Sequence, residues 1–173
     1  DIEVAVLDAE DRPLPPDAVG EIAIRGAVVM KGYRNNPAAT EEAFRNGWYH
    51  TGDLGKIDRD GYVYLLDRMK EMIITGGANV YPREVEEVLL LHPGVLEVAV
   101  VGVPDRLWGE SVLAVVRPRP GRTVAEEELL ALCRDHLAGY KKPRYVRFLD
   151  DLPKSGVGKI MKRDLKERFA REF

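Results

Sequence analysis

The chain has 173 residues, 45% hydrophobic and 32% charged, which suffices for one globular domain or two small ones. Its formal net charge of −3 argues against a generally basic nucleic-acid binder, and no apolar run is long enough to span a bilayer. The three histidines show no metal-ligand spacing, so we expect no metal site. The single cysteine, Cys133, excludes an internal disulfide and suits a cytoplasmic protein. It lies in an apolar helical pattern that favours a buried side chain over a nucleophile.

The first part of the chain alternates between apolar and polar residues in short runs, which predicts a β-rich region. Asn36, followed by a proline, predicts a capped helix that ends near residue 44. We expect residues 47–53 to form a loop. The expected strands cover residues 2–7, 20–26, 54–57 and 62–66, the last two joined by a turn. Because a strand pattern begins almost at residue 1, we expect the chain to be a piece of a longer protein.

The pattern changes at a short charged link, residues 67–71, and we place the boundary between domains 1–69 and 70–173 there. Beyond it, strands and helices alternate, which predicts a small α/β unit with one mixed sheet flanked by helices. Thr123, with Glu126 three residues later, predicts a capping box. We expect a turn at residues 76–79. The expected strands cover residues 72–75, 95–103, 112–116 and 145–149, and the expected helices cover residues 82–91, 123–137 and 163–169.

Residues 48–54 combine aromatic side chains, a glycine and Asp53. An ionised aspartate only accepts hydrogen bonds, so Asp53 suits the two neighbouring hydroxyls of a ribose. The segment is equally compatible with an aspartate that caps its own turn.

Arg68 lies in the charged link and presents a planar group that can donate to a ribose or phosphate oxygen. The link could also be a surface cluster of ion pairs. Gly76 and Gly77 follow it, and they allow the backbone to approach a ligand closely, although they could also form a simple turn.

Residues 152–160 place Lys159 after two glycines, as in a phosphate-binding loop. The Walker pattern requires glycine where Pro153 stands and serine or threonine where Ile160 stands, so we reject it. What remains is a glycine-hinged, mobile loop that delivers one ammonium group. Such a charge can stabilise the oxyanion that develops when a carboxylate attacks a phosphate.

Together these segments resemble the class I adenylate-forming enzymes, which include acyl-CoA synthetases, 4-coumarate–CoA ligases, luciferases and peptide-synthetase adenylation domains. The resemblance lies in the order and spacing of residues 32–40, 48–53, 67–73, 76–86 and 153–159. It implies that residues 1–69 are the last part of a large N-terminal AMP-binding domain. It also implies that residues 70–173 are a small C-terminal lid domain.

The resemblance further implies an acid–thiol ligase that converts a carboxylic acid and Mg²⁺-bound ATP to acyl-AMP and then transfers the acyl group to coenzyme A. Asp53 and Arg68 resemble the residues that contact the ribose of ATP and AMP. Lys159 resembles the lysine that bridges the carboxylate and the α-phosphate. Lys70 resembles the hinge about which the lid rotates between the two half-reactions.

On the coenzyme A side, Gly77 resembles the glycine that lines the pantetheine tunnel. Lys141 lies in a basic stretch, residues 140–143, similar to one that meets the phosphates of coenzyme A. Glu84 resembles a structural acidic residue on the following helix.

The serine-, threonine- and glycine-rich phosphate loop of this family is missing from the sequence, and the family's acyl pocket lies upstream of these motifs. We therefore expect no synthetase activity from this chain alone, and we favour a fatty acid as the substrate of the complete enzyme. Three alternatives remain: an adenylation domain that loads a carrier protein, a luciferase-like oxygenase, and a non-catalytic module that kept the lid fold.

The loop around Lys159 also resembles the form that lysine acetyltransferases modify in this family. Acetylation of Lys159 would remove its positive charge. The expected partners are thus a small carboxylic acid, ATP, coenzyme A and an acetyltransferase, with no nucleic acid and no transmembrane segment.

Overall fold

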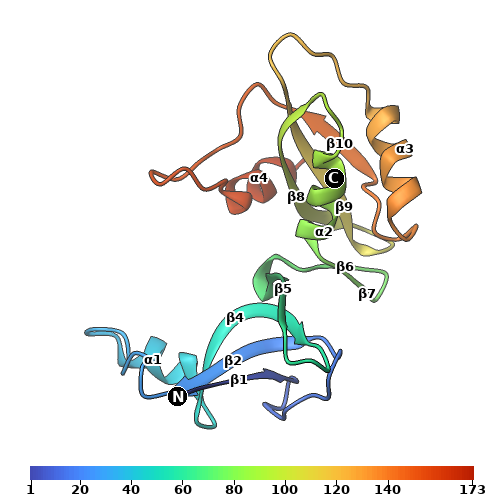
Figure 1. Cartoon of the computed structure of the whole chain (residues 1–173). Coiled ribbons are helices and arrows are strands. Elements are labelled where there is room, and N and C mark those ends of the chain that lie inside the picture. The colour runs from blue at the N-terminus through green and yellow to red at the C-terminus, as the bar shows by residue number, and fades with distance from the viewer. The chain divides into compact units, whose positions relative to one another are not determined.

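The computed structural model describes all 173 residues and divides into two compact units, residues 1–70 and 71–173 (Figure 1). The division falls one residue after the boundary expected from the charged link. Each unit has its own sheet and its own buried side chains. None of the helices has the length and apolar character needed to cross a bilayer.

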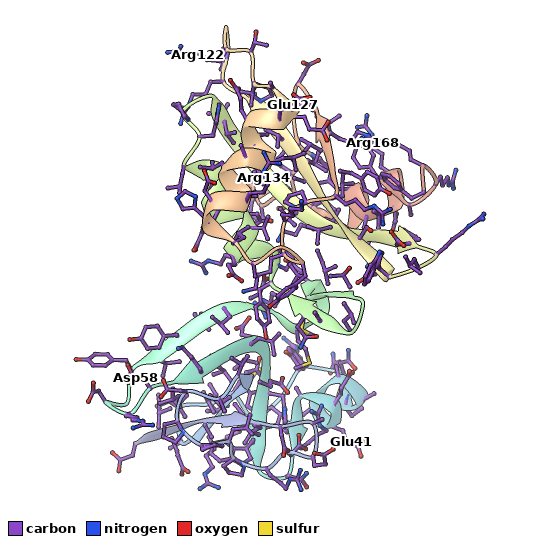
Figure 2. The ribbon with its side chains drawn as sticks, turned by 90° about the vertical axis from the view of Figure 1, so that its right-hand side faces the viewer. Glu41, Asp58, Arg122, Glu127, Arg134 and Arg168 are labelled. Atoms are coloured by element: carbon purple, nitrogen blue, oxygen red, sulfur yellow. The ribbon has the colours of Figure 1, made fainter.

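The first unit is an antiparallel sheet in the order β1-β2-β4-β3, with β5 also paired to β4. Its core is small and consists of Leu7, Ala23 and Trp48. The elements are β1 (Ile2–Leu7), β2 (Gly20–Gly26), α1 (Pro37–Ala43), β3 (Phe44–Arg45), β4 (Trp48–Ile57) and β5 (Val63–Arg68). Asp58 lies in the turn between β4 and β5 (Figure 2) and accepts hydrogen bonds from two backbone amides of that turn.

The start of the helix is confirmed, because the side chain of Asn36 accepts a hydrogen bond from the amide of Ala39. The prediction of a loop at residues 47–53 is wrong. Residues 48–53 belong to β4, because their backbone pairs with β2 and β3. Glycine and aspartate are uncommon in strands, so local propensity favoured a loop, and pairing with distant residues overrode it.

The reason for these residue types is a β-bulge in β4. Glu21 of β2 lies opposite Leu54, and Ala23 lies opposite His50, so residues 51–53 stand opposite the single residue Ile22. Gly52 adopts a φ of 72°, a conformation that favours glycine. Bulges change the direction of the side chains that follow, and this one sets the direction of Asp53.

The second unit contains a mixed sheet in the order β10-β9-β6-β7, with β8 paired to β9. The pair β9–β10 is parallel and the other pairs are antiparallel, which confirms the expected mixed sheet. The elements are β6 (Ile73–Thr75), β7 (Ala78–Val80), α2 (Pro82–Leu90), β8 (Val95–Asp105), β9 (Gly109–Pro118), α3 (Glu126–His136), β10 (Tyr145–Phe148) and α4 (Lys162–Phe169).

Helices cover both faces of this sheet (Figure 1). Val98 and Val100 of β8 pack with α2 and α3, whereas Val101 and Val103 pack with α4 on the other face. Because both faces are buried, β8 and β9 read as nearly continuous apolar runs instead of alternating ones. The outer side of α3 is polar, and Figure 2 shows its Glu127 and Arg134 on that surface.

Two local expectations for this unit are wrong. The capping box at Thr123 does not form, because α3 begins at Glu126 and the carboxylate of Glu128 accepts from the amide of Ala125. The turn at residues 76–79 is shorter than expected, because Ala78 and Asn79 pair with β6. The buried position of Cys133 is confirmed, and burial raises the pKa of its thiol to about 11.

Replacing Leu165 by alanine should destabilise the second unit, because this side chain of α4 is fully buried against the sheet. We expect the free energy of unfolding to fall by about 3 kcal/mol. Urea unfolding followed by far-ultraviolet circular dichroism measures it, and V157A, at an 82% exposed position, is the control. Equal midpoints for L165A and V157A would contradict the assigned packing of α4.

Candidate functional site

The structure brings Asp53 and Arg68 together as directly opposite residues of β4 and β5. Nε of Arg68 lies 2.8 Å from Oδ1 of Asp53, and Nη1 donates to the carbonyl of Thr51 at 3.0 Å. Their side chains are 30% and 53% exposed, so both remain accessible to a ligand. The second carboxylate oxygen of Asp53 makes no hydrogen bond within the chain and is available to accept one.

Glu21, which the sequence analysis missed, fixes the bulge that carries Asp53. One oxygen of its carboxylate accepts from the amide of Gly52 at 3.0 Å, and the other lies 2.7 Å from Nδ1 of His50. The hydroxyl of Thr51 accepts from the amide of Asp53 at 3.1 Å. The bulge is thus held by side chains as well as by the ladder. In the sequence Glu21 is only a polar position in an alternating strand, which predicts a solvent-facing side chain.

A cavity of about 640 Å³ lies beside this pair in the first unit. Its lining includes Tyr33, Thr51, Gly52, Arg68 and Lys70. A phenol ring, the guanidinium groups of Arg45 and Arg68 and several backbone groups can together bind a planar, polar ligand with hydroxyl or phosphate groups. A hydrogen bond with Tyr33, followed by burial, raises the pKa of neighbouring Tyr49, so this phenol stays neutral at ordinary pH.

Lys70 lies in a single 3₁₀ turn, η1 (Met69–Glu71), and the two compact units divide directly after it. Its side chain is exposed and makes no ion pair. The residue expected to be the hinge therefore lies at the border between the two units.

Lys159 lies on an exposed hairpin loop that hydrogen bonds hold together. The amide of Met161 donates to the carbonyl of Pro153, and Ser155 and Lys159 are joined by two further bonds from backbone amides. Gly158 closes the turn with a φ of 81°. The loop is therefore built to present the side chain of Lys159, and that ammonium group has no partner within the chain.

Two ion-pair groups attach this loop to the rest of the unit. Before the turn, Lys154 lies 2.8 Å from the carboxylate of Glu97 and 3.2 Å from that of Asp151. The hydrogen bond from Lys154, with one from Arg117, lowers the pKa of Glu97.

After the turn, Lys162 lies 2.8 Å from Glu86 and 3.1 Å from Glu71. Burial lowers the pKa of Lys162, but the two carboxylates outweigh burial and raise it overall. The charged triad ties the start of α4 to α2 and to the segment that follows Lys70.

Gly76 and Gly77 form the turn between β6 and β7, both with positive φ. A Cβ atom on Gly76 would lie 2.4 Å from the ring of Trp108, so the ring packs directly on this backbone. A Cβ atom on Gly77 would meet nothing within 4 Å, which leaves open space above that residue. Only the first glycine is therefore required by packing inside the chain.

The two lysines in the basic stretch at residues 140–143 have different surroundings. Nζ of Lys141 lies 2.7 Å from both carboxylate oxygens of Glu84, so the chain itself pairs this charge. Lys142 instead lines a cavity of about 420 Å³ together with Trp108, Tyr140 and Arg144. The sequence pattern indicated the stretch but not Lys142 and Arg144 individually, because spacing alone does not reveal which basic side chains are paired.

The chain is similar in sequence to one protein family and to several known proteins. Residues 84–159 match the family described as the AMP-binding enzyme C-terminal domain. The chain is 49% identical to feruloyl-CoA synthase from Amycolatopsis sp. over 96% of its own length and 34% of that protein. It is 48% identical to long-chain-fatty-acid–CoA ligase from Escherichia coli over 95% of its length and 29% of that protein.

The ATP-bound crystal structure of MatB from Rhodopseudomonas palustris superposes with a TM-score of 0.91 at 43% identity. This match covers 98% of the chain and 34% of that structure. The chain thus spans about a third of the length of the relatives that it matches.

The charged triad yields a stability prediction. In K162M the carboxylates of Glu71 and Glu86 lose their common cation, so we expect the free energy of unfolding to fall by roughly 3 kcal/mol. K166M, on the same helix, removes a more exposed pair with Glu110 and should cost less than about 1 kcal/mol. Urea unfolding compares the two, and equal stability of both variants would rule out a stabilising role for the triad.

Proposed function

Because this chain belongs to the AMP-binding, adenylate-forming enzymes, we propose that it is the C-terminal part of an ATP-dependent acid–CoA ligase. In this proposal residues 1–70 complete the nucleotide site and residues 71–173 form the lid. The relatives are acid–CoA ligases by name, and the chain matches them over nearly its whole length. The activity belongs to the complete enzyme, of which this chain corresponds to about a third.

The observation that carries the proposal is the distribution of lysine charges in residues 71–173. Four lysines make ion pairs within the chain: Lys141, Lys154, Lys162 and Lys166. Lys142 and Lys159 make none, and both are exposed. A cation without an internal partner is available to an anionic ligand, and these two lie in the places that suit the two half-reactions.

In the first half-reaction a carboxylate oxygen of the acid bonds to the α-phosphorus of ATP, and the bond from that phosphorus to the pyrophosphate oxygen breaks. Negative charge concentrates between the carboxylate and the α-phosphate. Lys159 places its ammonium there and stabilises the transition state more than the ground state. Asp53 accepts hydrogen bonds from the ribose hydroxyls, and Arg68 holds that carboxylate in place.

In the second half-reaction the lid turns about Lys70, and the thiolate sulfur of coenzyme A attacks the acyl carbon while AMP leaves. The cavity at Trp108 and Tyr140 offers aromatic faces for adenine, and Lys142 and Arg144 offer cations for phosphates. The open space above Gly77 leaves room for the pantetheine arm. Lys141 is paired with Glu84, whereas Lys142 lines the cavity and makes no ion pair within the chain.

Mg²⁺ enters this reaction with ATP. The chain contains no group of three histidine, cysteine or acidic side chains that could ligate a metal. These residues therefore do not provide a site for Mg²⁺.

A cavity with aromatic rings and cations favours coenzyme A over a carrier protein, since the nucleotide of coenzyme A has no counterpart on a phosphopantetheine attached to a protein. The relatives include both an aromatic acid and fatty acids as substrates by name, so the chain supports a carboxylic acid. A fatty acid remains our proposal for its class. A non-catalytic module would not need to keep the two unpaired lysines.

The exposed hairpin also suits modification. Acetylation of Lys159 would remove the charge that the first half-reaction needs while leaving the coenzyme A cavity intact. We propose that a lysine acetyltransferase regulates the complete enzyme in this way.

In the complete enzyme, K159A should lower acid-dependent exchange of pyrophosphate into ATP by about 100- to 1,000-fold, because one charge at the transition state is lost. Thioester formation from preformed acyl-AMP should change little. The matched control K142A should show the reverse pattern, with normal exchange and a raised KM for coenzyme A. Equal loss of both half-reactions in K159A would count against the separate roles.

The chain by itself should form no acyl-CoA when mixed with ATP, Mg²⁺, coenzyme A and a panel of carboxylic acids. The phosphate loop and the acyl pocket of the family are not found among its residues. Chromatographic detection of acyl-CoA tests this, with a complete acid–CoA ligase as the positive control. Product above the no-enzyme level would show that the chain carries a full site.

A further inference from the structure

We infer that Asp105 is a positioning residue for the coenzyme A site, which holds Trp108 and Arg144 in the orientation in which they line the cavity. This inference rests on the coenzyme A site proposed above and adds a residue that is itself outside the lining of that cavity. Asp105 ends β8, and its side chain is only 9% exposed.

The carboxylate of Asp105 binds four donors. Oδ1 accepts from the amides of Leu107 at 2.8 Å and Trp108 at 3.0 Å. Oδ2 accepts from the hydroxyl of Ser111 and from Nη1 of Arg144 at 2.7 Å. The hydrogen bond from Ser111, with those from the two amides, lowers the pKa of Asp105 to about 2. The group is thus anionic throughout the ordinary pH range, and its two oxygens accept all four hydrogen bonds.

The first two bonds fix the turn between β8 and β9, and this turn carries Trp108. The carbonyl of Trp108 accepts from the amide of Gly76 at 2.9 Å, and its ring packs on the backbone of Gly76. Trp108 is therefore held from the Asp105 side and from the β6–β7 turn, while 48% of the residue remains exposed for a ligand. An aromatic ring held in this way can stack on a base without first losing conformational freedom.

The fourth bond fixes Arg144. Its guanidinium has five N–H donors, of which one is directed at Asp105, and its side chain is 52% exposed. Without this bond the side chain would have several rotamers, and ordering it on a phosphate would cost affinity. Asp105 therefore holds an aromatic side chain, which can stack on a base, and a cationic side chain, which can bind a phosphate.

The test uses the 173-residue chain and measures its affinity for coenzyme A by titration calorimetry. D105N should raise the Kd roughly tenfold, because charged hydrogen bonds to the turn and to Arg144 are lost. D150N makes the same substitution at an exposed position and should bind as the wild type does. Pantetheine lacks the nucleotide, so we expect its Kd to be the same for the wild type, D105N and D150N.

A double-mutant comparison separates positioning from general stability. In a W108A/R144A background, D105N should have no further effect on the Kd, because the two groups through which it acts are gone. A tenfold loss that persists in that background would overturn the inference. If D105N does not fold, D105E keeps the charge, displaces the carboxylate by one methylene group and should also weaken binding.

The outcomes distinguish the two proposals. Binding of coenzyme A by the wild type, with unchanged affinity in folded D105N or D105E, would overturn the role of Asp105 and leave the coenzyme A site intact. No binding of coenzyme A by the wild type would overturn the site and the role of Asp105 together.

Discussion

The ladder between β8 and β9 is the constraint on which the second unit depends. Both of its faces are buried under helices, so a shift of one residue would turn every apolar side chain to the wrong helix. Its two ends carry the groups assigned to the two half-reactions. Glu97, which lies opposite Arg117, holds Lys154 at the start of the Lys159 hairpin, and the turn at the other end carries Trp108. The sheet thereby positions the Lys159 hairpin and the Trp108 turn at its two ends.

Charge pairing within the second unit divides its lysines into paired and unpaired ones. Lys162 is held by two carboxylates in a largely buried position, and Lys141 is held by Glu84. These pairs order the segments on either side of the exposed hairpin and the basic stretch. The ammonium groups of Lys159 and Lys142 make no ion pair within the chain, and both residues are exposed. In the first unit the bulge in β4 likewise leaves a charged group accessible. It directs the carboxylate of Asp53 toward Arg68, and one oxygen of that carboxylate stays free.

Sequence patterns predicted most of the elements, because helices α1, α2 and α4 and the long strands have strong periodicity or caps. They failed for the strand at residues 48–53 and for the start of α3. Residues 48–53 have the composition of a loop, yet they form a bulged strand because β2 and β3 supply partners. Thr123 has the residue type of a cap, yet α3 begins three residues later, at Glu126. The strand depends on partners that are distant in the sequence, whereas the start of α3 follows a local hydrogen bond, from the amide of Ala125 to the carboxylate of Glu128, in place of one at Thr123.

The sequence by itself determined the family resemblance, the mixed sheet of the second unit and the candidates Asp53, Arg68 and Lys159, because residue type and order carry that information. Tertiary structure alone decided which charges are free. Glu84 is 57 residues from Lys141, and Asp105 is 39 residues from Arg144, so their pairing required the folded sheet. It also revealed Glu21 and Asp105 as supports, since a carboxylate that orders distant donors has no pattern in the sequence. The physical reason is that hydrogen bonds and ion pairs act over a few ångströms in space, whatever the separation along the chain.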